Sequence, residues 1–142
     1  MGLTLQLLAS TFLIILVTLV HGTGVVVIGK LFQYEDSALE GRKLAFREFR
    51  LMVPMALCLF GLHVLEIGLF AAFYIAVGEI VSIDEALYVS AAAYTTLGIS
   101  EGALVHWKLV GVFEGLAGFL MIGWSAAVFV SDMERILRRR QD

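Results

Sequence analysis

Two polar residues that could do chemistry, His63 and Glu66, stand three positions apart in an otherwise apolar stretch. That spacing would place both side chains on one face of a helix. His21 and Glu114 lie in two other apolar stretches. An ionised side chain inside a membrane needs a partner, so each of these four residues is a candidate for function or for a structural polar contact.

Two interpretations of His63 and Glu66 stay open. Histidine titrates near neutral pH, so the pair could act as a proton-sensitive gate. The pair could instead form a hydrogen-bonded tether to the first apolar stretch, in which His21 stands between Thr18 and Thr23. A transition-metal site is not expected, because the pair offers only two ligands.

A different chemistry is indicated by the stretch AAAYTTLGISEGA at residues 91–103. It follows a predicted helix of about 11 residues that starts near Ile83, where Ser82 can cap and Asp84 and Glu85 suit the first turn. Such a helix is too short to cross a bilayer. Non-helical backbone at membrane depth is tolerated only where protein buries it or where it lines a water-filled path. We therefore expect a re-entrant loop.

The composition requires an apolar solvent for these elements. Of the 142 residues, 60% are hydrophobic and 16% charged, whereas soluble domains average about 45–50% and about 25%. Three apolar segments, at about 3–29, 51–78 and 108–131, are long enough to span a bilayer. Pro54 is expected in the first turn of the second segment. Cys58 is the single cysteine, so no disulfide framework is expected.

The basic residues predict the orientation. All of them except Lys108 lie at 30–50 or in the C-terminal tail. The positive-inside rule then places both regions in the cytoplasm, with the N-terminus and residues 79–107 outside. The prediction is a multi-pass protein of the cell (inner) membrane.

The motif ALYVSAAAYTTLGISE resembles the pore helix and filter signature T-[VL]-G-Y-G-D of pore-loop cation channels of the potassium-channel type. Thr95 and Thr96 match the paired threonines, Leu97 the aliphatic position and Gly98 the first glycine. The segment HVLEIGLFAAFYIAVG resembles the outer helix of bacterial two-span channel domains, and WKLVGVFEGLAGFLMIGWSAAVFV resembles the inner helix.

The resemblance implies an all-α membrane protein with three transmembrane helices, a re-entrant pore helix and a filter loop, assembled as a tetramer. Residues 1–30 form an extra N-terminal transmembrane helix, and 31–50 form a cytoplasmic loop or interfacial helix. The pore domain covers 51–131, and a basic cytoplasmic tail covers 132–142. Within the pore domain the expected parts are the outer helix 51–78, pore helix 83–95, filter 96–101 and inner helix 107–131.

The filter departs from the family pattern after its first glycine, where Ile99-Ser100-Glu101 replaces Tyr-Gly-Asp. Backbone carbonyl oxygens replace the water shell of the ion in this family, and some of those positions need φ > 0. Gly98 keeps one such position, and Ser100 loses the other. Monovalent cations (K⁺ or Na⁺) are expected at Thr96, Leu97 and Gly98, with K⁺ conducted at reduced K⁺/Na⁺ selectivity.

The inner helix carries further residues implied by the resemblance. The family's pore-helix glutamate falls on Ala92, so Glu114 is expected to support the filter instead. Gly118 falls on the hinge glycine, and Gly123 on a second recurrent glycine. The inner pore and gate would then be lined by Phe119, Ile122, Ala126 and Val130, at spacings of one helical face; plain helix packing is the other interpretation.

We therefore expect a homotetrameric cation channel in contact with membrane lipids, with no cofactor, no nucleic-acid partner and no enzymatic activity. The alternative is a non-conducting regulatory or assembly subunit on the same scaffold, with a collapsed filter. A third interpretation, a small transporter with His63, Glu66 and Glu114 as a proton relay, lacks the inverted repeats of that class.

Overall fold

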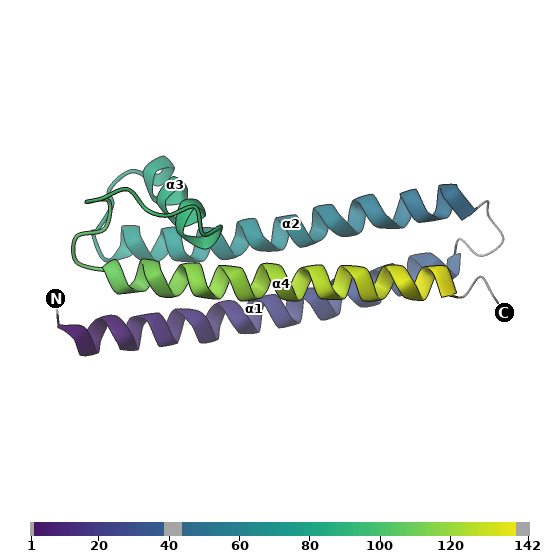
Figure 1. The fold of residues 1–142 in the computed structure, drawn as a ribbon, viewed down its shortest axis with the longest axis horizontal. Coiled ribbons are helices and arrows are strands. Elements are labelled where there is room, and N and C mark those ends of the chain that lie inside the picture. Colours follow the sequence, from purple (N-terminus) through teal and green to yellow (C-terminus); the bar gives the residue numbers. More distant parts are fainter. Residues whose placement is uncertain (1, 39–43, 139–142) are drawn as a thin grey trace.

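The computed structural model describes residues 2–38 and 44–138, which form four helices and no strand (Figure 1). The helices are α1 (Leu3–Ala38), α2 (Leu44–Ala76), α3 (Ile83–Tyr94) and α4 (Lys108–Arg138). The three long helices lie side by side, and α2 runs antiparallel to the other two (Figure 1). The short helix α3 packs against α2 and α4, at the end of the bundle where α1 begins.

Three of these helices are long and apolar enough to cross a membrane: Leu3–Phe32, Phe49–Ala76 and Lys108–Arg135. The short helix lies between the second and third of them. The protein therefore has the architecture of an all-α multi-pass membrane protein, as the sequence predicted. Which end of the bundle faces the cytoplasm stays a prediction.

The helix boundaries differ from those expected. A separate loop or interfacial helix was predicted at 31–50, but α1 continues to Ala38 and α2 already begins at Leu44. The stretch from Lys30 to Ala38 contains no proline or glycine, so nothing in it breaks the helix. The expected inner helix 107–131 likewise continues to Arg138. Residues 39–43 and 139–142 of the predicted loop and tail lie outside the described residues.

The early start of α2 also corrects the place of Pro54, which was expected in a first turn. Pro54 lies inside the helix, where it has no N–H to offer to the carbonyl oxygen of Arg50.

The main apolar core lies at the α3 end of the bundle and takes residues from all four helices. Its fully buried members include Val17 of α1, Phe70 and Tyr74 of α2, Tyr94 of α3 and Val110 of α4. A second cluster lies further along α1 and α2 and contains Val25, Ile28, Met55, Leu59 and Leu62. The first cluster holds α3 against α2 and α4.

Glycines on α4 let α3 approach closely. A Cβ atom on Gly118 would lie 2.1 Å from the backbone oxygen of Tyr94, and one on Gly115 would lie 3.1 Å from that of Ala93. Small residues commonly permit such approach between membrane helices. Gly118, which the resemblance assigned to a hinge, is therefore a packing position for the C-terminal end of α3.

Candidate functional site

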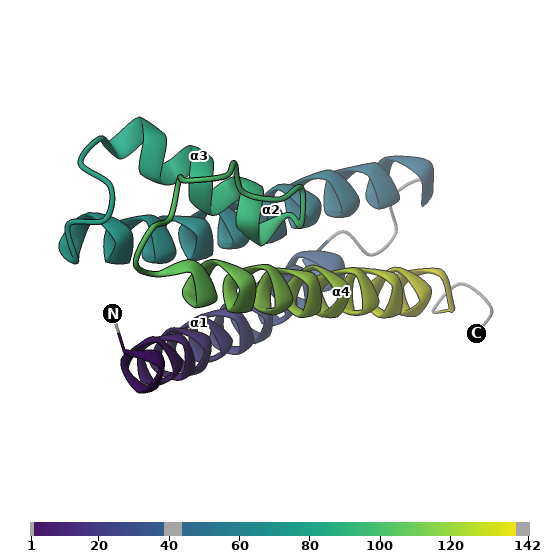
Figure 2. The same ribbon diagram turned by 60° about the vertical axis from the view of Figure 1, so that its left-hand side comes forward.

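The loop after α3 folds back over the last turn of the helix and then runs along α3 to the start of α4 (Figure 2). The backbone N–H of Thr96 donates to Ala93 O at 2.9 Å, and that of Gly98 to Ala92 O at 3.2 Å. Gly98 has a φ of 98°, the conformation expected for it. Thr96 has a φ of 62°, which is unfavourable for a β-branched residue by about 1–3 kcal/mol.

The predicted ion-binding residues of this loop are exposed in the single chain. Thr95, Thr96, Leu97 and Gly98 are all exposed, with Leu97 at 84%. In the described part of the chain, no hydrogen bond ends on the carbonyl oxygens of Thr96, Leu97 or Gly98. Unpaired backbone oxygens in hydrocarbon cost several kcal/mol each, roughly. The loop therefore suits a place that water, an ion or another polar surface reaches.

The second half of the predicted filter has a different environment. The Ile99 side chain is partly buried and points toward Gly111 of α4, while Ser100 and Glu101 are exposed. A hollow of about 510 Å³ separates the loop from α4 and is lined by both, with Thr96, Gly98 and Glu101 on one side and Lys108, Val112 and Gly115 on the other. Ile99 thus anchors the loop to α4 within the chain.

Glu114 is fully buried and holds α3 rather than the filter loop itself. The Tyr74 hydroxyl donates to Glu114 Oε2 at 2.6 Å, and Ser90 Oγ lies 2.5 Å from Glu114 Oε1. Ser90 Oγ also lies 2.8 Å from the carbonyl oxygen of Ile67, which can only accept. Because Ser90 has one proton, a protonated Glu114 that donates to Ser90 satisfies every bond in this cluster.

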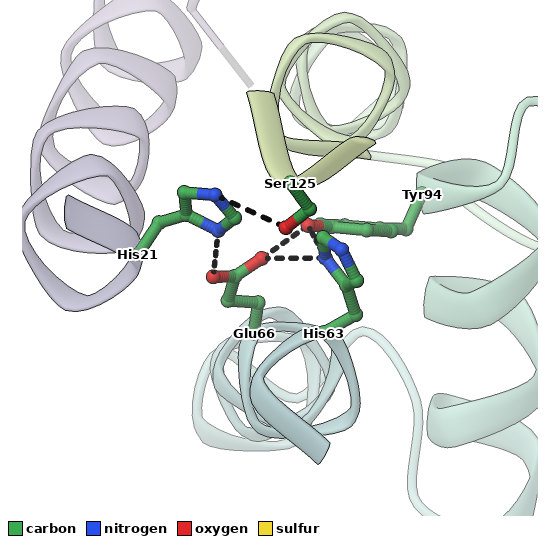
Figure 3. A network of polar contacts seen from close by, with 5 residues as sticks. All are labelled: His21, His63, Glu66, Tyr94 and Ser125. Atoms are coloured by element: carbon green, nitrogen blue, oxygen red, sulfur yellow. Dashed lines mark hydrogen bonds and ion pairs between the residues drawn. The ribbon is translucent and has the colours of Figure 1, made fainter. Parts of the chain in front are cut away.

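The other predicted polar residues form one buried network that joins all four helices (Figure 3). His21 Nδ1 lies 2.8 Å from Glu66 Oε1, and His63 Nδ1 lies 3.3 Å from Glu66 Oε2. The Tyr94 hydroxyl donates to Glu66 and lies 2.9 Å from His63 Nδ1. Ser125 of α4 lies 3.5 Å from His21 Nε2. The contact between α1 and α2 is the tether that was one of the two interpretations.

Four members of these two clusters were not found from the sequence: Tyr74, Ser90, Tyr94 and Ser125. Ser90 and Tyr94 are four residues apart and share the buried face of α3. Hydroxyl groups in an otherwise apolar helix were the sequence feature that could have indicated these two residues, because buried hydroxyls form hydrogen bonds. Which partner each one reaches depends on tertiary packing.

The predicted pore-lining residues of α4 point away from the other helices of the chain. Phe119 is 64% exposed, Ile122 40% and Val130 55%, and Ala126 is exposed as well. Burial within the chain covers only part of their surface, so it does not fully explain their apolar character. They are free to face a central path, lipid or a second copy.

Glu79 joins the two ends of the segment that carries α3. Its side chain accepts hydrogen bonds from the backbone N–H groups of Val105 and His106, and His106 Nδ1 lies 3.1 Å from Glu79 Oε2. Burial raises the pKa of Glu79, but the hydrogen bonds from His106 and Val105 outweigh burial and hold this pKa below its ordinary value. Glu79 thus links the turn before α3 to the backbone just before α4.

We predict that the hydrogen bonds from Val105 and His106 to Glu79 break at acidic pH. A carboxylate whose pKa is lowered by folding contributes stability above its unfolded pKa, about 4.3, and loses that contribution as the pH falls through the folded pKa. The amide NMR shifts of Val105 and His106 should therefore move together as the pH is lowered from about 6 to about 3. Glu79→Gln should abolish this titration; an unchanged titration in that variant would assign it to another group.

The chain was compared with protein-family models, curated proteins and solved structures, and none of them matches it.

Proposed function

We propose that this chain is one subunit of a homotetrameric cation channel in which Thr96, Leu97 and Gly98 line the ion path. The observation that carries the proposal is the loop after α3, whose residues are exposed and whose backbone oxygens at Thr96, Leu97 and Gly98 lack hydrogen-bond partners within the described chain. Carbonyl oxygens that surround a common axis can replace the hydration shell of a cation. A loop of this kind between two membrane-spanning helices supports a pore.

A ring of subunits gives the loop the surroundings it needs. One loop cannot enclose an ion, and closed symmetric rings are the common form of homo-oligomers. An exposed apolar face on α4, formed by Phe119, Ile122 and Val130, extends from the level of the loop toward the C-terminal end of the helix. Side chains of this kind suit the wall of a path that closes by dewetting. The fourfold symmetry follows from the resemblance alone.

Flux through liposomes that contain the full chain tests the proposal. Gly98→Ala should reduce K⁺ flux by about tenfold or more, because a Cβ at φ 98° strains the loop by about 1–3 kcal/mol. Gly78→Ala is the matched control, since Gly78 also has a positive φ, 70°, but lies in the turn after α2. Flux through the control should stay within about twofold of the unmodified chain.

The same measurement separates the competing functions. No flux above that of empty liposomes would favour the non-conducting subunit. Saturating, proton-coupled flux would favour a transporter. Equal losses in Gly98→Ala and Gly78→Ala would show that backbone strain at any turn between α2 and α4 is responsible, and would remove the support for Gly98 as part of the ion path.

We also expect a selectivity change when the loop is restored to the family pattern. Replacement of Ile99-Ser100 by Tyr-Gly should raise the K⁺/Na⁺ permeability ratio, because glycine restores a second position that tolerates φ > 0. Reversal potentials under asymmetric K⁺ and Na⁺ measure this ratio. An unchanged ratio would mean that the sites at Thr96, Leu97 and Gly98 set the selectivity by themselves.

A further inference from the structure

We propose that His21, His63 and Glu66 form a binding site for a divalent transition-metal ion of the zinc class. The site lies inside the helix bundle, and its use as a metal site does not depend on cation conduction. The sequence offered only a two-ligand pair, His63 and Glu66, but the fold adds His21 from α1 as a third ligand. Two imidazoles and one carboxylate are a ligand set typical of zinc.

The distances between the donor atoms suit such an ion. One donor atom from each residue can be chosen so that all three lie within 4.8 Å of one another. Bonds of about 2.0–2.1 Å in tetrahedral geometry place donors roughly 3.3 Å apart. The two separations that involve Glu66 are close to this value, with Oε1 2.8 Å from His21 Nδ1 and Oε2 3.3 Å from His63 Nδ1. The two imidazole rings, with centroids 5.5 Å apart, would have to move closer together when the ion binds.

A fourth ligand and an outer-shell partner are also in place. The Tyr94 hydroxyl lies beside both His63 and Glu66, so it or a water molecule can complete the coordination. Metal at Nδ1 leaves the proton of His21 on Nε2, which faces Ser125 Oγ at 3.5 Å. Histidine ligands commonly donate their second ring N–H to such a partner, which fixes the tautomer.

Burial makes a positive ion favourable at this position. His21 and Glu66 are fully buried, and the His63 side chain is 16% exposed. With both imidazoles neutral, the cluster carries the negative charge of Glu66 inside an apolar bundle, where an uncompensated charge is costly. A divalent cation supplies the opposite charge.

The experiment is a titration of the purified full chain with Co²⁺ after treatment with a chelator. Co²⁺ replaces Zn²⁺ in such sites and has visible absorption bands that report four-coordinate geometry. We expect one Co²⁺ per chain with these bands, and their loss when Zn²⁺ is added. His21→Gln, His63→Gln and Glu66→Gln should each weaken binding by about 100-fold or more, and Ser125→Ala by about tenfold.

His106→Gln is the matched control, because His106 and Glu79 form a similar pair that has no third ligand among the described residues. The control should bind Co²⁺ as the unmodified chain does. Absence of saturable binding by the unmodified chain, or equal binding by His63→Gln, would overturn the proposal. If a variant does not fold, the Co²⁺ spectrum of the unmodified chain decides: octahedral bands or none would exclude the site.

Discussion

Gly118→Ala is expected to destabilise the protein more than any other single methyl addition on α4. The added Cβ would lie 2.1 Å from the backbone oxygen of Tyr94 and 2.8 Å from its carbonyl carbon. Backbone atoms cannot move aside as a flexible side chain does, so α3 must shift away from α4. Overpacking of this kind costs about 1–3 kcal/mol, and the cost is higher when the backbone itself has to move.

The shift should also affect the candidate ion path. Tyr94 ends α3 and directly precedes Thr95 and Thr96, so movement of its backbone displaces the loop. We expect Gly118→Ala to lower the thermal denaturation temperature in detergent by about 10 °C and to lower K⁺ flux.

Two other glycines of α4 serve as graded controls. Gly115→Ala should have a smaller effect, since its Cβ would lie 3.1 Å from Ala93 O. Gly123→Ala should be neutral or stabilising, because nothing lies within 4 Å and alanine favours a helix by about 1 kcal/mol. A hinge role for Gly118 predicts a different result, in which stability is unchanged and only gating is altered. That result would contradict the packing explanation.

Glu114→Ala should cause the second large loss of stability. The substitution leaves the hydroxyls of Tyr74 and Ser90 without the partner they have in the buried cluster. A buried polar group without a partner costs about 1–3 kcal/mol, and the cavity left by the side chain adds to this. We expect a total of about 3–5 kcal/mol, measured by denaturation in detergent.

Glu114→Gln is the matched comparison. An amide has the shape of a neutral carboxylic acid and can donate to Ser90 Oγ while it accepts from the Tyr74 hydroxyl. If Glu114 is protonated, as the bond from Ser90 to Ile67 O indicates, this variant should keep stability within about 1 kcal/mol. A loss as large as that of Glu114→Ala would instead mean that the cluster needs an ionised carboxylate.

The short helix α3 and the loop after it were partly predictable from local sequence. The acidic pair Asp84 and Glu85 after Ser82 indicated the start of α3, and the helix does begin at Ile83. The capping bond itself differs, since the Ser82 hydroxyl reaches the Asp84 carboxylate and makes no side-chain cap to the backbone. The positive φ of Gly98 was expected from its lack of a Cβ, but that of Thr96 was not.

The candidate site was less predictable, because its members come together only in three dimensions. His63 and Glu66 were paired by helical spacing, which is a local property. His21 lies 45 positions from Glu66 along the chain, and Tyr94 lies 28. No spacing rule covers such separations, so a contact with the stretch around His21 was only one of two interpretations, and the tyrosine hydroxyl was not assigned from the sequence at all.

The sequence by itself determined the long apolar helices, the short helix between two of them and the conformational freedom at Gly98. These follow from hydropathy, helix-start signals and backbone sterics, which act over a few residues or one helix length. Only the tertiary structure decided where α1 ends and where α2 begins. It also decided that Gly118 faces Tyr94 and that His21 contacts Glu66. Those features depend on how helices pack against one another, and close packing is decided by all the facing side chains together.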